Sequence, residues 1–315
     1  MTDHIVSIDA GNGYTNAVRM MKRGLDSVGF PSVRAQVTGD SLGLGSEFEL
    51  EVEYIQYGSH RFAVGDDVFI SRKAVERHQG SNRYGNEMWL FLVSVALGKL
   101  LPKSGGSVDL TVFAPPSMYK DAKHAINKRM TEIHNTITVQ FKGDSKPRIF
   151  SISSLTVHPE GLGAVGAFAL NDAGQPVNVD ILSGETVVLD AGMYTLDALA
   201  MSNGNFNPES LQSATWESQG IKAHILDPVL RVVKKQGDDF SLLTTDDIDR
   251  TLRAGITTGN YTLTSGSSII DIKPAVDKYA TRYAGWIANN IIDGQFSNLR
   301  GIKSLILVGG GAVLI

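Results

Sequence analysis

Two stretches of the sequence carry residue types that can hold a phosphate group and a metal ion. The motif Ile-Asp-Ala-Gly spans residues 8–11, and Leu-Asp-Ala-Gly spans residues 189–192. Glycines in a turn leave backbone N–H groups uncrowded, and such groups can close on phosphate oxygens. Carboxylates such as those of Asp9 and Asp190 suit hydrated Mg²⁺, which prefers oxygen ligands and keeps several waters. The two motifs therefore predict a pair of turns that clamp a polyphosphate, with Mg²⁺ held through waters by Asp9 and Asp190.

A threonine follows each motif and could add a hydroxyl donor. Thr15 comes six residues after Asp9, and Thr195 comes five residues after Asp190. A single Asp-x-Gly turn after a strand is most often an ordinary turn, because these residue types favour turns for conformational reasons alone. The functional interpretation thus depends on the second copy and on what surrounds both.

Short apolar segments and turn residues predict that both motifs end β-strands. Near the N-terminus, the pattern favours a strand followed by antiparallel returns and a further hairpin, over residues 5–8, 14–21, 25–30, 54–57 and 61–64. Residues 185–189 predict the strand before the second motif, and residues 305–308 predict a buried strand that runs into Gly309–Gly311.

Helical patterns lie between these strands. Residues 86–101 predict a buried helix, because the apolar run Met88–Leu97 is interrupted only by Ser94 and is shorter than the roughly 20 residues needed to cross a bilayer. A strand is predicted at 110–113. A second helix should begin near Pro274, end near Gly294 and bury one face at spacings of three and four, formed by Val276, Ala280, Tyr283, Ile287 and Ile291.

The domain organisation follows from length and turn composition. A chain of 315 residues, 42% of them hydrophobic, has enough material for two domains. Turn-forming residues at 171–176 predict an exposed connection. We therefore expect domain I at residues 1–180 and domain II at residues 181–315.

Composition limits the partners. The chain has 29 basic and 33 acidic residues, a formal charge of -4, so direct nucleic-acid binding and attraction to a membrane are not expected. Cysteine is absent from the sequence, which excludes disulfides, thiolate metal sites and thiol nucleophiles. The N-terminal residues do not resemble a signal peptide. A cytoplasmic protein is expected.

Four elements in order carry a resemblance to a known superfamily. They are Asp9-Ala-Gly-Asn-Gly-Tyr-Thr-Asn, Val157-His-Pro-Glu-Gly, Leu189-Asp-Ala-Gly-Met-Tyr-Thr-Leu-Asp and Leu307-Val-Gly-Gly-Gly-Ala. Their order resembles the actin, hexokinase and heat-shock chaperone superfamily over nearly the whole chain. The plasmid-segregation actins of the ParM type look most similar, because Val112-Phe-Ala-Pro-Pro also resembles one of their segments.

The resemblance implies an α/β protein with the two-lobed actin-like, ribonuclease-H-like ATPase fold, which binds ATP or GTP with Mg²⁺ in a cleft between lobes. It implies three groups of nucleotide contacts: a first phosphate loop, a second phosphate loop and an adenosine loop. The expected residues are Asp9, Gly11, Asn12, Gly13, Tyr14, Thr15 and Asn16; Asp190, Gly192, Met193, Tyr194 and Thr195; and Gly309, Gly310 and Gly311. The family's usual C-terminal helix is expected to be missing after Ile315.

Further residues are assigned through the same resemblance. Glu160 matches the acidic residue that orients or activates the attacking water, so Glu160 and Asp190 are the expected catalytic residues. Glu217, Gly220 and Lys222 match the segment that passes the sugar and base. The structural alternative for Glu160 and Glu217 is a carboxylate at a helix start, and for Gly220 a turn residue.

The function implied by the resemblance is an ATPase that forms filaments with itself, engages a DNA-bound adaptor protein and moves plasmid DNA, with hydrolysis driving disassembly. Two alternatives stay open: a small-molecule kinase of the same superfold, and a nucleotide-binding regulator that does not polymerise. Fold alone does not decide among them.

Overall fold

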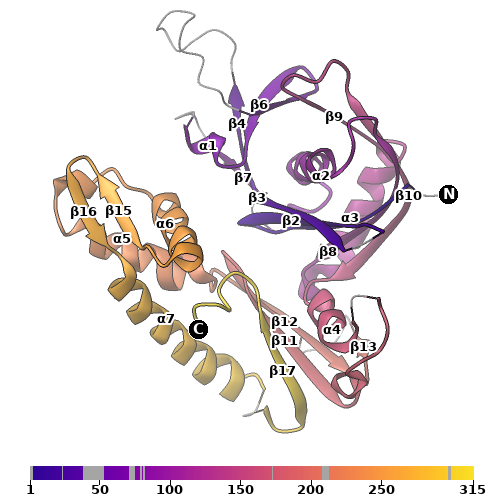
Figure 1. The fold of residues 1–315 in the computed structure, drawn as a ribbon. Helices are drawn as coiled ribbons and strands as arrows, with labels where there is room; N and C mark the ends of the chain where they lie inside the picture. Colours follow the sequence, from indigo (N-terminus) through magenta and orange to yellow (C-terminus); the bar gives the residue numbers. More distant parts are fainter. Residues whose placement is uncertain are drawn as a thin grey trace, which may run out of the picture. The chain divides into compact units, whose positions relative to one another are not determined.

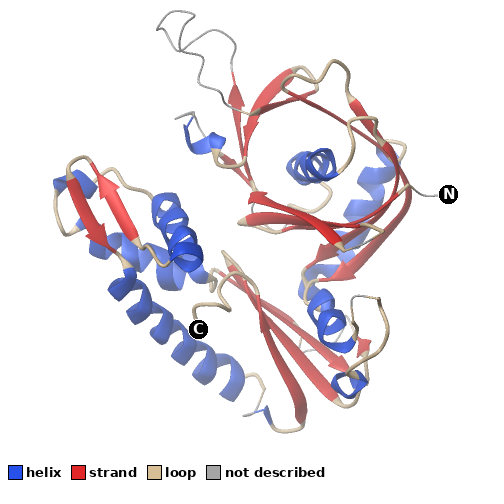
Figure 2. Cartoon of the chain, in the orientation of Figure 1, coloured by secondary structure: helices blue, strands red, loops and turns tan. Residues whose placement is uncertain are grey.

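A mixed β-sheet organises the N-terminal half of the chain (Figures 1 and 2). This computed structural model describes residues 3–22, 24–37, 53–70, 75–78, 80, 82–171, 173–207, 213–296 and 299–315. Contacts divide the chain into unit 1, Met1–Pro159, and unit 2, Glu160–Ile315. This division comes before residue 180 because α4 (Leu162–Ala169) and η2 (Val179–Leu182) pack on the sheet of unit 2.

Ten strands form the sheet of unit 1. In sheet order they are β3 (Leu25–Pro31), β2 (Tyr14–Met20), β1 (His4–Ala10), β8 (Gly106–Ala114), β10 (Arg148–Pro159), β9 (Thr136–Phe141), β5 (Tyr54–Tyr57), β6 (His60–Val64), β4 (Val33–Val37) and β7 (Glu76–Arg77). The central strands β1, β8 and β10 are parallel, and the remaining pairs are antiparallel. The strands and hairpins predicted in this half are confirmed.

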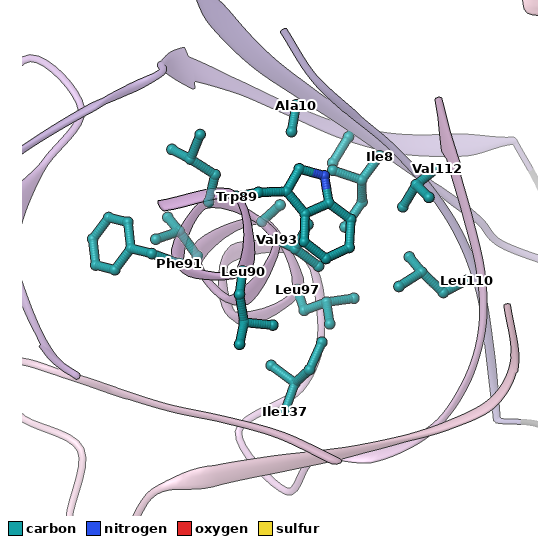
Figure 3. Close-up of a cluster of buried hydrophobic side chains, with 14 of the residues drawn as sticks. Ile8, Ala10, Trp89, Leu90, Phe91, Val93, Leu97, Leu110, Val112 and Ile137 are labelled. Carbon is teal, nitrogen blue, oxygen red and sulfur yellow. The ribbon is translucent and has the colours of Figure 1, made fainter. Parts of the chain in front are cut away.

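The sheet of unit 1 curls around helix α2 (Glu87–Leu100) (Figure 1). Asn86 caps this helix, since its side chain accepts a hydrogen bond from the backbone N–H of Trp89 at 2.8 Å. Every residue of the run Met88–Leu97 is buried. Figure 3 shows side chains on several sides of α2 meeting those of the surrounding strands. A helix that is apolar all round is a core helix, so the sequence prediction is confirmed.

Three shorter elements complete unit 1: α1 (Asp67–Ile70), η1 (Pro116–Met118) and α3 (Tyr119–Glu132). Helix α3 contacts β8 and β10, and the Tyr119 hydroxyl donates to the Val157 carbonyl at 2.9 Å. Within the described parts of the whole chain, every helix is too short or too polar to span a bilayer.

Unit 2 is built on a five-stranded sheet with helices on both faces. Its strands run in the order β13 (Asn205–Phe206), β12 (Thr195–Ser202), β11 (Glu185–Ala191) and β17 (Ile302–Val308), and β14 (Ala214–Glu217) also pairs with β12. One face packs on α4 and η2. The other packs on a larger group of elements: η3 (Lys222–Leu226), α5 (Asp227–Lys234), η4 (Asp238–Phe240), α6 (Thr245–Thr258), β15 (Thr262–Ser265), β16 (Ser268–Asp271), α7 (Lys273–Ile287) and η5 (Ala288–Asp293).

The C-terminal predictions have mixed outcomes. Helix α7 has Pro274 in its first turn, and the five residues predicted to form the buried face of α7 and η5 are all buried. Gly294 is the C-cap of η5, as predicted for the end of the helix. The strand predicted at residues 305–308 is confirmed as part of β17, but the prediction that it is buried is wrong for two of its four residues. Strand β17 lies at the edge of its sheet, and Leu305 and Leu307 are 37% and 38% exposed.

The two units repeat one arrangement of strands. In unit 1 the hairpin β1–β2 pairs on one side with β3 and on the other, in parallel, with β8. In unit 2 the hairpin β11–β12 pairs on one side with β14 and on the other, in parallel, with β17. Each hairpin turn carries one copy of the Asp-Ala-Gly motif.

Candidate functional site

The first candidate phosphate loop is the turn between β1 and β2. Asp9 and Asn16 face each other in the ladder, and the loop residues Gly11–Tyr14 follow. A Cβ atom on Gly11 would lie 2.9 Å from the carbonyl oxygen of Tyr14, so a larger residue would force the turn open. Gly11–Tyr14 are partly exposed and Asn16 is exposed, which leaves this loop accessible.

Thr15 lies beneath this loop. Its side chain is fully buried, and its hydroxyl is 2.9 Å from that of Ser32. Ser32 in turn donates its backbone N–H to the Gly13 carbonyl at 2.9 Å and accepts from the backbone N–H of His78 at 3.2 Å. Thr15 therefore braces the loop from within, and a direct phosphate contact through its hydroxyl stays a prediction.

A buried histidine lies next to this brace. Burial, together with the nearby positive charge of Arg83, lowers the pKa of His78 to about 3, so its ring is neutral at neutral pH. The buried Arg83 guanidinium donates to the Tyr84 hydroxyl at 2.8 Å. Ser32, His78 and Arg83 were missed from the sequence, because they belong to no motif and only the fold brings them to the loop.

The second candidate phosphate loop has the same length as the first. Four residues separate the paired positions Ala10 and Thr15, and four separate Ala191 and Leu196. Thr15 and Thr195, which follow their aspartates by six and five residues, therefore occupy different positions in the two hairpins. Thr15 corresponds to Leu196, which is also fully buried.

Thr195 turns its hydroxyl to a buried carboxylate. It donates to Asp197 at 2.7 Å, and the Thr215 hydroxyl of β14 donates to the other oxygen of the same carboxylate. Asp197 is only 4% exposed. As a site residue it was missed, although residues two apart on a strand share a face, so the spacing Thr-Leu-Asp is a signal that could have indicated it.

Backbone hydrogen bonds join the second loop to the segment that follows β14. The N–H groups of three consecutive residues donate to carbonyls of the loop: Gly220 to Tyr194 at 3.1 Å, Ile221 to Gly192 at 3.0 Å, and Lys222 to Met193 at 2.9 Å. Within the loop, the Gly192 N–H donates to the Thr195 carbonyl at 3.0 Å. The predicted phosphate loop and the predicted sugar-and-base segment thus form one backbone unit.

The glycine run after β17 packs against the same end of β11. The Gly311 N–H donates to the Ala191 carbonyl at 2.9 Å. Gly309 has a φ of +89°, and a Cβ atom there would overlap the Asp190 carboxylate. A Cβ on Gly220 would lie 2.6 Å from backbone atoms of Met193. Three predicted segments therefore meet around the turn at residues 190–194 inside unit 2, and glycines allow their close approach.

Gly309 should not tolerate a larger residue. Gly309→Ala is expected to lower the free energy of unfolding by about 2–4 kcal/mol, because it adds left-handed strain to a clash with packed atoms. Gly310→Ala is the matched control, since Gly310 has no positive φ and a Cβ there meets open space. Urea denaturation followed by circular dichroism measures both. Equal midpoints for the two variants would contradict the packing described.

Two residues of the predicted sugar-and-base segment, Glu217 and Lys222, differ in their surroundings. Glu217 is exposed and pairs with Thr195 in the ladder, so its carboxylate is accessible. The Lys222 ammonium forms an ion pair with Asp227 at 2.8 Å. Lys222 reaches a nucleotide only if it leaves or shares that carboxylate, and its contact stays a prediction.

Glu160 lies just before helix α4. It follows β10 and precedes Gly161, which has a φ of +87° and occupies the N-cap position. The carboxylate is partly exposed. Its place fits both the structural alternative of a helix-start residue and the predicted catalytic role. The catalytic role depends on where the attacked phosphate lies, and it stays a prediction.

The acidic residues at the two loops are the candidate ligands for a metal ion. Among the described residues, histidine and acidic side chains do not gather in groups of three or more that could hold a metal. A dehydrated metal centre needs such a group, whereas Mg²⁺ that keeps its waters needs only one or two carboxylates. Asp9 in unit 1 and Asp190 in unit 2 occupy the same register in their hairpins, and each taken by itself fits the second kind of site.

Comparisons with known proteins agree with this architecture. Residues 7–163 match the family described as the N-terminal domain of actin like proteins. A search of curated proteins gave no match. The chain resembles an archaeal actin homologue in complex with ADP, with a TM-score of 0.72, 21% identity, and coverage of 100% of this chain and 89% of the other.

Two bacterial structures are similarly related. A 15-stranded ParM filament from Clostridium botulinum has a TM-score of 0.72 and 21% identity over 100% of this chain and 90% of the other. ParM of Bacillus thuringiensis with AMPPNP has a TM-score of 0.69 and 17% identity over 100% and 89%. At these identities the likeness concerns the fold. Residues 7–163 therefore belong to the family of actin-like N-terminal domains, and the chain has the actin-like fold along its whole length.

Proposed function

We propose that the chain binds ATP or GTP with Mg²⁺, hydrolyses it and assembles into filaments of its own kind. The observation that carries this proposal is the convergence of three segments around the turn at residues 190–194, tied by backbone hydrogen bonds and packed through Gly220, Gly309 and Gly311. Such close backbone packing gathers small residues beside the Asp190 carboxylate, where a nucleotide could approach the backbone closely. An archaeal actin homologue with ADP and a ParM with AMPPNP share this fold.

In this proposal, different residues contact the phosphates and the sugar and base of the nucleotide. The loops Gly11–Asn16 and Gly192–Thr195, with Asp9 and Asp190 at their strand ends, hold the phosphates. Glu217, Gly220, Lys222 and Gly309–Gly311 lie along the sugar and base. Mg²⁺, when bound, neutralises phosphate charge and presents ordered waters. Glu160 accepts a hydrogen bond from the attacking water and holds it in line.

In this proposal the filaments serve to transport DNA. The filaments engage a DNA-bound adaptor protein in the cytoplasm and move plasmid DNA, and hydrolysis drives their disassembly. A formal charge of -4 makes an adaptor a better link to DNA than direct binding. For hydrolysis to act in this way, the triphosphate must bind the assembly-competent conformation more tightly than the diphosphate does.

Sedimentation with ATP, GTP, ADP or without nucleotide tests this function. We expect pelleting with a triphosphate, release of phosphate, and return to the supernatant after the triphosphate is consumed. Nucleotide binding without pelleting under any condition would contradict filament formation. Phosphate transfer to a small molecule would then favour a kinase, and binding without turnover a regulator.

A further inference from the structure

Gln219 is held at two points, immediately before the three N–H groups that bind the second loop. Its side-chain oxygen accepts a hydrogen bond from Nε2 of His224 at 2.7 Å, and its backbone carbonyl accepts from the Tyr283 hydroxyl at 2.6 Å. Since an amide oxygen can only accept, the proton of His224 lies on Nε2. Both donors come from elements outside the loop, η3 and α7.

The two donors stack on each other. The rings of His224 and Tyr283 are 4.5 Å apart between centroids with an interplanar angle of 18°, and Trp286 lies 4.9 Å from His224. Tyr283 and Trp286 are three residues apart and so share one side of α7. Tyr283 is fully buried, whereas His224 and Trp286 are half-buried. The stack restricts the direction in which each donor points.

The π-helical turn η3 presents His224 to this stack. The Asp227 N–H donates to the Lys222 carbonyl five residues earlier, which widens the turn directly after the segment that binds the loop. Isolated π-helical turns occur frequently at functional sites. Here the wide turn begins at Lys222, the last of the three residues bonded to the loop, and contains the histidine that fixes Gln219.

The electrostatic surroundings keep both groups as donors. Burial, and to a smaller extent Asp190 and Asp197, raises the pKa of Tyr283, so its hydroxyl stays protonated. Burial lowers the pKa of His224, which favours the neutral ring with a single N–H.

We propose that His224 and Tyr283 are positioning residues that fix Gln219, and through it hold the Gly220–Lys222 backbone against the second loop for a purine nucleotide. This inference rests on the proposed nucleotide binding. Because the hydrogen bonds of both residues end on Gln219, losing either lets the segment move relative to the loop. The ring stack directs the bonds, and the bonds fix the segment.

Substitutions at His224 and Tyr283 can remove the hydrogen-bond donor and the aromatic ring separately. His224→Phe keeps the ring and removes the donor, His224→Gln keeps an amide donor and removes the ring, and Tyr283→Phe removes only the hydroxyl. Gln219→Ala removes the side-chain acceptor with little effect on the core. The matched control is His124→Gln, at an exposed position of α3 in unit 1.

Equilibrium binding of Mg-ATP and of Mg-ADP measures the effect. We expect His224→Phe, Tyr283→Phe and Gln219→Ala to raise the dissociation constants about threefold to tenfold, which corresponds to the loss of one hydrogen bond. His224→Gln should stay within about twofold of the wild type. In a Trp216→Phe background, where Trp89 and Trp286 remain, the fluorescence should change on nucleotide binding, less so in His224→Phe, and the change should disappear when Trp286→Phe is added.

The outcomes distinguish this inference from the function on which it depends. The inference is overturned if His224→Phe, Tyr283→Phe and Gln219→Ala bind nucleotide as tightly as a wild type that binds it. This holds even if the melting temperatures of the variants fall, because the residues are then only structural. If the wild type binds neither nucleotide, the proposed function fails and the inference with it. Rescue by His224→Gln together with weakening by His224→Phe supports the hydrogen bond as the positioning contact.

Discussion

Replacing Asp190 with alanine is expected to abolish Mg²⁺-dependent nucleotide hydrolysis. The carboxylate ends β11 at the point where Gly309 and the Ala191 backbone pack, and in our proposal it fixes the metal through waters. Removing it leaves the three tied segments in place, because their mutual hydrogen bonds are between backbone atoms. Phosphate release and Mg-ATP binding by the purified variant measure the loss.

Asp293→Ala is a control for this change, since Asp293 is an exposed carboxylate of the same unit at the end of η5. It should hydrolyse as the wild type does. Unchanged Mg-ATP affinity and turnover in Asp190→Ala would remove Asp190 from the site. A large fall in melting temperature in that variant would instead assign the carboxylate to the packing around Gly309.

Glu160→Ala should bind ATP normally and hydrolyse it about two to four orders of magnitude more slowly, the usual loss for a positioned general base. The residue precedes α4 with a partly exposed carboxylate, so its removal should disturb neither hairpin loop. Single-turnover hydrolysis with bound nucleotide separates chemistry from binding. Glu132→Ala on α3 is a suitable control, because Glu132 makes only a partly exposed i,i+3 ion pair.

The same variant tests hydrolysis as the timer of disassembly. Filaments of Glu160→Ala formed with ATP should last longer than wild-type filaments, since the terminal phosphate stays in place. Equal disassembly rates would show that hydrolysis does not set filament lifetime. A wild-type hydrolysis rate with normal binding would leave Glu160 as a structural residue at the start of α4.

Local patterns allowed much of the fold to be predicted. The strand before each Asp-Ala-Gly motif, the helix α2 and the buried face of α7 are each specified by residues close together in sequence. The meeting of the 190–195, 217–222 and 309–311 segments was expected only through the family resemblance. The contacts themselves are backbone hydrogen bonds, which do not depend on side-chain type and leave no pattern to recognise.

Long-range contacts account for what could not be predicted. Thr15 and Thr195 both follow a motif, but only the strand register shows that Thr15 occupies the buried position that Leu196 takes in the second hairpin. Likewise the Lys222 ion pair with Asp227 depends on the wide turn η3, and the exposure of β17 depends on its edge position. Burial of His78 beneath the first loop follows from the path of the chain through β4 and β7.

The enclosure of α2 within the sheet of unit 1 bears on how the chain is made in the cell. The helix is complete at Leu100, but β8, β9 and β10, which help to enclose it, end only at Pro159. At about 5–20 residues per second, a ribosome needs roughly 3–12 seconds to synthesise the intervening stretch. During that time a helix with apolar side chains on every side has no complete core to enter. The nascent chain should therefore be a substrate for ribosome-associated chaperones until β10 has emerged.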